Sequence, residues 1–177
     1  MNKKLKLWEL NRISEEEFSA QEKFPIVVIL DDIRSLNNIG SFFRTADAFN
    51  IEKIYLCGIT AVPPHREIQK TALGATQTVN WEYRDSLVEL VKELQASGTL
   101  VVAIEQTEET VFLHHINQIA FSKIALIFGN EVDGVAQEAI ELCDHVIEVP
   151  QFGTKHSLNV SVCAGVVLWE FSKRFFE

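Results

Sequence analysis

Short unbroken runs of apolar residues alternate along this chain with segments in which apolar residues recur every three or four positions. The runs have the length of β-strands, and their lack of polar alternation is typical of strands covered on both faces. They predict six strands, over residues 26–30, 54–57, 78–83, 100–104, 124–128 and 145–149. The periodic segments predict helices over residues 14–22, 39–50, 66–73, 87–97, 135–142 and 159–176. This alternation predicts an α/β fold with a mostly parallel six-stranded sheet and helices on both faces.

Polar residues mark where two of the helices begin. Ser14 followed by Glu17 has the spacing of a capping box, which is typical of a helix start. Asp85 or Ser86 can cap the helix over residues 87–97, because short polar side chains accept hydrogen bonds from the first free amides. Gly98 then ends that helix.

The chain shows no internal repeat and no Gly/Ser/Pro-rich linker. We therefore interpret residues 25–177 as one domain, preceded by a short N-terminal arm over residues 1–24. The last predicted helix is apolar nearly all round in its first half. That pattern is typical of burial on several sides, including against a partner chain.

Composition places the chain among ordinary globular proteins. Of its 177 residues, 47% are hydrophobic and 23% charged, which excludes intrinsic disorder. The longest apolar runs, such as residues 26–30, are too short to span a bilayer. No signal peptide is expected, because no apolar segment follows the first basic residues. The three widely spaced cysteines, Cys57, Cys143 and Cys163, are interpreted as buried small hydrophobes and favour the cytoplasm.

The net charge of −9 argues against a generic nucleic-acid binder, which usually carries a basic face. Local clustering matters more than the sum, however. The basic residues lie near the start of the chain or in and beside predicted loops: Lys3, Lys4, Lys6, Arg12, Arg34, Arg44, Arg66, Lys70 and Lys155.

Several familiar motifs of enzyme chemistry are absent. The sequence has no G-x-G-x-x-G, G-x-x-x-x-G-K-[ST], H-E-x-x-H, C-x-x-C or G-x-S-x-G. A nucleotide-cofactor oxidoreductase, P-loop hydrolysis and α/β-hydrolase chemistry therefore lose support. The five histidines are scattered, and no metal is expected.

Three other segments combine polar residues and glycines where a predicted strand passes into a loop. They cover residues 31–46, 127–134 and 149–161. Within them stand the patterns N-x-G-x-x-x-R-T-A, G-x-E-x-x-G and P-x-x-G-x-x-x-S-L-N-V-S, in this order. Since ligands of parallel α/β sheets bind at the carboxyl ends of strands, these segments are candidates for one site.

The three patterns together resemble the signature motifs of the SpoU-type (TrmH-like) RNA 2′-O-ribose methyltransferases of the SPOUT superfamily. The resemblance covers about residues 25–175. It implies transfer of a methyl group from S-adenosylmethionine to a ribose 2′-hydroxyl in tRNA or rRNA, with no metal. It also implies a homodimer whose chain forms a C-terminal trefoil knot. Many relatives carry a separate RNA-recognition domain, whereas this chain has only the short arm.

The resemblance also implies roles for particular residues. The positions that match the family's catalytic residues are Asn38, Arg44, Glu131, Ser157 and Asn159. The positions that match its cofactor contacts are Gly129, Val149 and Leu158, with Leu56 and Gly58 as weaker matches.

The chemistry of Arg44 suits the implied reaction. Its guanidinium is always charged and can hold a phosphate through two donors, so it could stabilise an alkoxide that forms nearby. The alternative is a solvated surface arginine paired with Asp47 or another carboxylate. A guanidinium is not easily deprotonated, and we therefore expect electrostatic activation of the hydroxyl rather than base catalysis.

The remaining candidates have structural alternatives. Asn38 can be the N-cap of the helix over residues 39–50, with Asn37 as the other candidate. Glu131 is interpreted as a residue that orients Asn38 or Arg44 or accepts hydrogen bonds from loop amides. Ser157 or Asn159 can cap the last helix; the neighbouring His156 does not make a catalytic triad with Ser157.

Two tryptophans are candidates for contacts with a partner chain or with RNA. Trp169 is interpreted as core or dimer packing, whereas Trp8 in the basic arm is the better candidate for an RNA contact. The first rival function is a non-catalytic RNA-binding or ribosome-associated protein with the same fold. The second is a SPOUT enzyme that methylates a base nitrogen.

Overall fold

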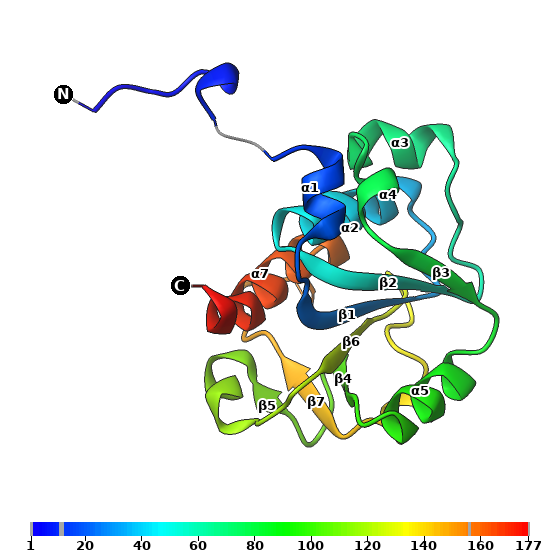
Figure 1. The fold of residues 1–177 in the computed structure, drawn as a ribbon. Helices are drawn as coiled ribbons and strands as arrows, with labels where there is room; N and C mark the ends of the chain where they lie inside the picture. Colours follow the sequence, from blue (N-terminus) through cyan, green and yellow to red (C-terminus); the bar gives the residue numbers. More distant parts are fainter. Residues whose placement is uncertain (1, 11–12, 156, 177) are drawn as a thin grey trace.

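A computed structural model describes residues 2–10, 13–155 and 157–176 of the chain. Within these residues seven strands form one sheet in the order β3-β2-β1-β6-β4-β7-β5 (Figure 1), and every neighbouring pair is parallel. The strands are β1 (Phe24–Asp31), β2 (Ile51–Cys57), β3 (Trp81–Arg84), β4 (Leu100–Ile104), β5 (Val111–Phe112), β6 (Ile124–Phe128) and β7 (His145–Glu148). The α/β fold with a parallel sheet is thus confirmed.

The number of strands differs from the prediction. All six predicted strands are present, and β5 adds a seventh at the edge of the sheet beyond β7. β5 is only two residues long, so it leaves no periodic pattern in the sequence.

The helices within the described residues alternate with the strands. They are α1 (Glu15–Ala20), α2 (Leu36–Ala48), α3 (Arg66–Ala72), α4 (Ala75–Thr78), α5 (Leu87–Ala96), α6 (Gln137–Ile140) and α7 (Val160–Ser172). Short 3-10 helices cover Leu7–Glu9, Leu113–Gln118 and Lys173–Phe175. The predicted helix over residues 66–73 ends at Leu73, which has a φ of +50°. Together with Gly74, at a φ of +93°, this left-handed turn separates α3 from α4.

The expected caps of α1 and α5 are confirmed, and the expected cap of α2 is wrong. Ser14 and Glu17 form a complete capping box on α1, and Ser86 caps α5. The cap of α2 is Ser35, whose hydroxyl accepts a hydrogen bond from the amide of Asn38 at 3.3 Å. Neither Asn37 nor Asn38 is the cap, because the helix begins earlier than its apolar pattern indicates.

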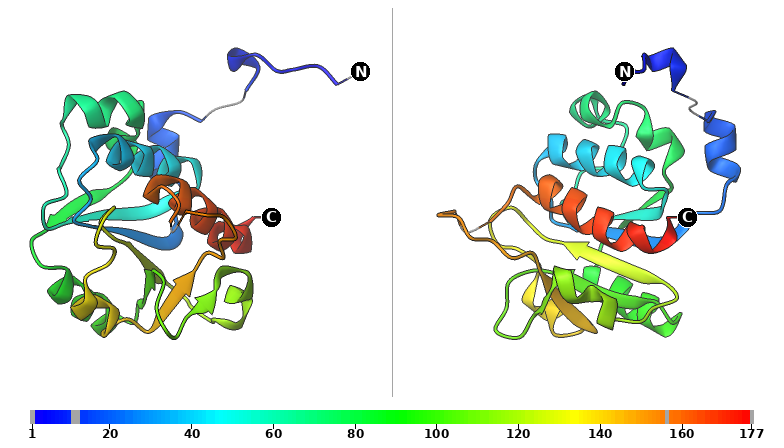
Figure 2. Two further views of the ribbon diagram at one scale, coloured as in Figure 1. Left: turned by 180° about the vertical axis from the view of Figure 1, so that it is seen from behind. Right: turned by 90° about the vertical axis from the view of Figure 1, so that its left-hand side faces the viewer.

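Helices cover both faces of the sheet (Figure 2). The side chains of β1 alternate between two apolar layers, with Ile26 and Val28 facing the layer of α2 and α7. Val27 and Ile29 face the layer of α5 and α6. This two-sided burial explains why the strand reads as an unbroken apolar run.

The order of strands gives the sheet a switch point near its middle, between β1 and β6. From β1 the chain proceeds outward to β2 and β3, whereas on the other side of β1 the later strands lie in the order β6, β4, β7 and β5. The loops that follow β1 and β6 therefore diverge next to one another at the carboxyl ends of these strands. Such a switch point is the usual position of a ligand site in a parallel sheet. Among the described helices, none is long and apolar enough to cross a membrane.

Candidate active site

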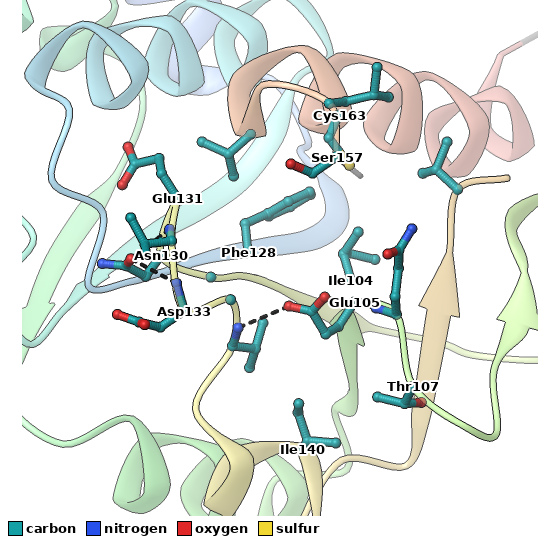
Figure 3. A pocket seen from close by; sticks show the side chains of 18 of the residues that line it. Ile104, Glu105, Thr107, Phe128, Asn130, Glu131, Asp133, Ile140, Ser157 and Cys163 are labelled. Atoms are coloured by element: carbon teal, nitrogen blue, oxygen red, sulfur yellow. Dashed lines mark hydrogen bonds between the residues drawn. The ribbon is translucent and has the colours of Figure 1, made fainter. Parts of the chain in front are cut away.

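A cavity of about 560 Å³ opens at the carboxyl ends of β6, β4 and β7 (Figure 3). This volume is within the range of small-molecule and cofactor sites. The wall consists of residues 104–107 after β4, residues 128–135 with Gln137 and Ile140, Val149 and Gln151 after β7, and residues 157–160 with Cys163 at the start of α7. Segments from across the second half of the chain thus meet around one space.

Glycines allow the loop after β6 to fold tightly against itself. Asn130 and Gly134 exchange two backbone hydrogen bonds, of 2.9 and 3.0 Å. A Cβ on Gly129 would lie 2.1 Å from the carbonyl carbon of Gly134, and Gly134 itself has a φ of +72°. Both positions of the G-x-E-x-x-G pattern therefore require glycine for close approach or for a left-handed backbone.

Three polar side chains fix this loop to the rest of the sheet edge. Asn130 donates to the carbonyl of Asp32 at 2.7 Å and accepts from the loop amide of Val132 at 2.8 Å. Asp31 and Glu105 accept from the amides at positions 136 and 135, at 3.0 and 3.1 Å. The shape of the cavity wall is therefore set by side chains at the ends of β1, β4 and β6.

Glu131 joins the loop to the start of α2. Its carboxylate accepts hydrogen bonds from the amides of Arg34 and Ser35, both at 3.1 Å, and from Asn38 Nδ2 at 3.0 Å. Desolvation raises the pKa of this carboxyl group, but the hydrogen bonds from the Arg34 amide and the Asn38 side chain outweigh it. The pKa of Glu131 therefore lies below its ordinary value, and the group is ionised at neutral pH.

Asn38 lies at the centre of a polar cluster. Its side chain is 8% exposed and also accepts hydrogen bonds at Oδ1 from Asn159 Nδ2 (3.2 Å) and Ser161 Oγ (3.4 Å). We call Asn38, Glu131, Asn159 and Ser161 the polar hub. The hub brings together one residue or more from each of the three sequence patterns.

Asn159 also caps α7. Its Oδ1 accepts hydrogen bonds from the amides of Ser161 and Val162, at 3.0 and 3.3 Å. Asn159 is therefore the cap of the last helix, and Ser157 is not. Ser157 is exposed and lines the cavity (Figure 3), while His156 lies outside the described residues.

Arg44 stands apart from the polar hub. It is exposed on α2 and forms no ion pair within the described residues. The alternative partner, Asp47, instead accepts a hydrogen bond from Thr78 Oγ1 at 2.5 Å. The structure thus leaves the guanidinium of Arg44 available to a ligand that approaches from outside the chain.

Three of the five expected cofactor positions line the cavity, namely Gly129, Val149 and Leu158. Leu56 and Gly58 do not. Leu56 is fully buried in the core, and Gly58 follows β2 on the other side of β1, where its Cα faces the Asp32 carboxylate. These two weaker assignments are not supported by the geometry.

Sequence reasoning missed the segment that follows β4. Glu105, Gln106 and Thr107 line the cavity directly after that strand. They are a polar segment at the carboxyl end of a buried strand, which is the same signal that marked the other loops. Residues 105–107 contain no glycine pattern, and they were therefore not among the predicted site segments.

The described residues offer little metal or thiol chemistry. Among them, no three His, Cys, Asp or Glu side chains gather closely enough to hold a metal ion. Cys57 is buried as expected, whereas Cys143 and Cys163 are only partly buried. Burial raises the pKa of Cys57 and Cys143 to about 12 and that of Cys163 to about 11, so these thiols are protonated at neutral pH.

Comparison with known proteins agrees with the three patterns. The model of the SpoU rRNA Methylase family matches residues 25–169. The 23S rRNA (guanosine-2′-O-)-methyltransferase RlmB of Neisseria meningitidis is 34% identical over 146 residues, which cover 82% of this chain and 57% of that protein. The chain thus spans little more than half the length of that relative.

Two solved structures share the fold. The TrmH/SpoU tRNA modifying enzyme of A. aeolicus aligns with a TM-score of 0.78 and 26% identity, covering 90% of this chain and 79% of that one. The AdoMet-bound rRNA methyltransferase of Sinorhizobium meliloti aligns with a TM-score of 0.81 and 26% identity, covering 88% and 59%.

Proposed function

The chain belongs to the SpoU rRNA Methylase family, and from this premise we propose that it transfers a methyl group from S-adenosylmethionine to a ribose 2′-hydroxyl of tRNA or rRNA. The observation that carries the proposal is the polar hub at the rim of the cavity. It joins Asn38, Glu131 and Asn159, which match the family's catalytic positions, through direct hydrogen bonds. A fold retained only for binding needs no such arrangement.

The cavity fits the proposed cofactor. Ile104, Phe128, Val149 and Leu158 give its wall an apolar part suited to an adenine ring, and main-chain groups stand at the strand ends around them. Gly129 lets the backbone approach closely there. When bound, S-adenosylmethionine supplies an electrophilic methyl group on its sulfonium sulfur.

The protein's part in the reaction is placement and charge. Asn38 is held rigidly by the other members of the polar hub, so its amide can position a ribose hydroxyl at the cavity rim. Ser157 adds a hydroxyl to the same rim. The ionised Glu131 acts as a positioning residue for Asn38 and for the start of α2.

Arg44 is proposed to activate the 2′-hydroxyl electrostatically. Its fork of donors holds the RNA phosphate and stabilises the negative charge that develops on the ribose oxygen. Because Arg44 lies outside the polar hub of its own chain, the proposal requires the RNA, or a second copy of this chain, to bring it to the reacting group.

We also propose that the protein is a homodimer. Val162, Val166 and Trp169 are spaced along one stripe of α7 and are 54%, 43% and 50% exposed. Trp169 packs edge-on against Phe49, which extends the apolar surface toward the end of α2. A stripe of this kind is normally covered by another protein surface.

Family membership also supports a C-terminal trefoil knot, formed by the segments that wall the cavity. The proposal further divides the chain into an arm, residues 1–24, and a catalytic domain, residues 25–177, and assigns it to the cytoplasm.

In the arm, Lys6 Nζ lies 5.0 Å from the centre of the exposed ring of Trp8, a pairing suited to a nucleobase and its phosphate. Arg12 of the basic arm lies outside the described residues.

Methyl transfer tests the proposed reaction directly. Purified protein, radiolabelled S-adenosylmethionine and RNA from a strain that lacks this gene are combined, and tRNA and rRNA are separated before digestion to nucleosides. Label in a 2′-O-methylated nucleoside, lost with Arg44→Ala, supports the proposal. Label in a base would instead favour the base-methylating enzyme. No label and no cofactor binding by calorimetry would favour the non-catalytic RNA-binding protein.

A further inference from the structure

The charged residues that line the cavity all carry the same sign. They are Glu105, Glu131 and Asp133, and no Lys, Arg or His is among the lining residues within the described chain. A cavity walled by acids attracts a cation more strongly than a neutral molecule, because low-dielectric walls focus the field. This inference rests on the proposed function, since it concerns how the cavity treats the proposed cofactor.

The three acids are not equivalent. Glu131 is engaged by three donors, two from the loop after β1 and one from the first turn of α2. Asp133 is exposed, and its side chain accepts no hydrogen bond within the described residues. Glu105, directly after β4, is partly buried and directs its carboxylate between the loop and the strand ends (Figure 3).

The position of Glu105 is built into the loop. Its Oε2 accepts from the amide of Val135 at 3.1 Å, and its Oε1 accepts from the amide of Gln106 at 2.8 Å. A Cβ on Gly134 would lie 2.2 Å from Oε2, so this glycine leaves room for the carboxylate. Each oxygen has a further lone pair, and within the described residues no basic side chain pairs with the group.

The charge of Glu105 acts on groups across the cavity. Cys163 lies in the opposite wall, at the start of α7 (Figure 3). Burial is the main cause of the raised pKa of its thiol, and the negative charge of Glu105 is the second. A group bound between the two residues lies within the same field.

Methyl transfer changes the charge of the cofactor. S-adenosylmethionine carries a sulfonium, an ammonium and a carboxylate, and is a net monocation. When the carbon–sulfur bond breaks, its electron pair stays on sulfur, so the product S-adenosylhomocysteine has no net charge. We propose that Glu105 makes the cavity prefer the cationic methyl donor over this neutral product, which assists product release.

Calorimetry on the free protein tests this preference without turnover. The dissociation constants of S-adenosylmethionine and S-adenosylhomocysteine are measured for wild type, Glu105→Gln and the matched control Glu108→Gln. Glu108 is exposed and outside the cavity wall, so its removal takes away the same charge without touching the cavity. The ratio of the product's to the donor's dissociation constant should fall by about five- to tenfold in Glu105→Gln, the effect of one unit charge at several ångströms in a partly screened site. It should stay unchanged in Glu108→Gln.

The ratio separates charge recognition from damage to the loop. If Glu105→Gln weakens both ligands by the same factor, Glu105 only anchors the loop and the inference is wrong. Added salt should bring the wild-type ratio of the two dissociation constants closer to one. A ratio that does not respond to salt would also contradict the inference. If neither ligand binds to wild type, the proposed function fails instead. Thermal unfolding of each variant verifies that it is folded.

Discussion

Asn38 Nδ2 donates a hydrogen bond of 3.0 Å to Glu131 Oε1 across 93 residues of sequence. The same carboxylate accepts from two amides at the start of α2. One side chain therefore fixes both the first turn of α2 and the amide that is proposed to hold the ribose.

Replacement of Glu131 should change how stability depends on pH. Folding lowers the pKa of the Glu131 carboxyl group below its ordinary value of 4.5. The ionised carboxylate therefore stabilises the fold at pH values above 4.5. That contribution is lost as the pH falls through the lowered, folded value. Glu131→Gln should therefore have a lower Tm than wild type at pH 7, and the difference should shrink as the pH falls below about 4. Thermal unfolding from pH 7 to pH 3 measures it. The exposed Glu138→Gln is the control, and a difference that grows toward acid pH would contradict the assignment.

Arg44 should matter for activity and hardly at all for stability. It is exposed and forms no ion pair within the described residues, so Arg44→Ala should leave the Tm and the cofactor dissociation constant almost unchanged. Single-turnover methyl transfer should slow by roughly a thousandfold, since a preorganised positive charge is removed. Arg44→Lys should recover only part of the rate because lysine lacks the planar fork. A rate for Arg44→Lys close to wild type would show that the fork is not needed.

A charge on the exposed stripe of α7 should separate the proposed dimer. Trp169→Glu and Val162→Glu each place a carboxylate where an apolar surface is proposed to be buried, which is costly for an unpaired charge. Size-exclusion chromatography with light scattering should show a shift toward the monomer mass of 20.1 kDa. Ile59→Glu, which changes an exposed apolar residue elsewhere, should leave the mass as in wild type. Val162→Glu leaves the ring contact between Trp169 and Phe49 in place, so this variant guards against simple loss of packing around Trp169. If wild type itself elutes as a monomer, the dimer is wrong.

A single methyl group on Gly129 should distort the cavity wall. The added Cβ of Gly129→Ala would lie 2.1 Å from backbone atoms of Gly134 and Val135, which cannot move without shifting the loop. The expected cost is about 1–3 kcal/mol of stability, together with weaker cofactor binding. Gly153→Ala is a close control, because a Cβ there meets nothing within 4 Å. Chemical denaturation and calorimetry measure the two effects. Equal stability of both variants would mean that the loop adapts to the methyl group.

The sequence predicts the sheet well because its strands are buried on both faces. Side chains of β1 enter both apolar layers, so the whole strand reads as one hydrophobic run. The same logic fails for β5, since two residues at a sheet edge carry no period. It also misplaces the start of α2, where Asn37 is exposed and Asn38 joins the polar hub instead of the apolar core. Ser35 is itself a residue type favoured at helix N-caps, but the apolar spacing begins only at Ile39 and points to Asn37 or Asn38.

The site was predictable to the extent that its residues belong to the three patterns. The patterns identify Glu131 and Asn159, and Ser161 is the last residue of the third pattern, but its hydroxyl contacts in the polar hub were not predicted. Leu56 and Gly58, the weaker matches to the family's cofactor contacts, do not line this cavity. Which strand ends meet is set by the order of strands, and that order does not follow from local pattern. Glu105 was missed for the same reason.

The last helix completes both the cavity wall and the polar hub, because Leu158 and Asn159 immediately precede α7. During synthesis this segment emerges from the ribosome after every strand of the sheet. A partly made chain can therefore form most of its core and still lack a place for a ligand. Any molecule that occupies the cavity binds only the finished fold, and by mass action it protects newly completed chains against unfolding and degradation.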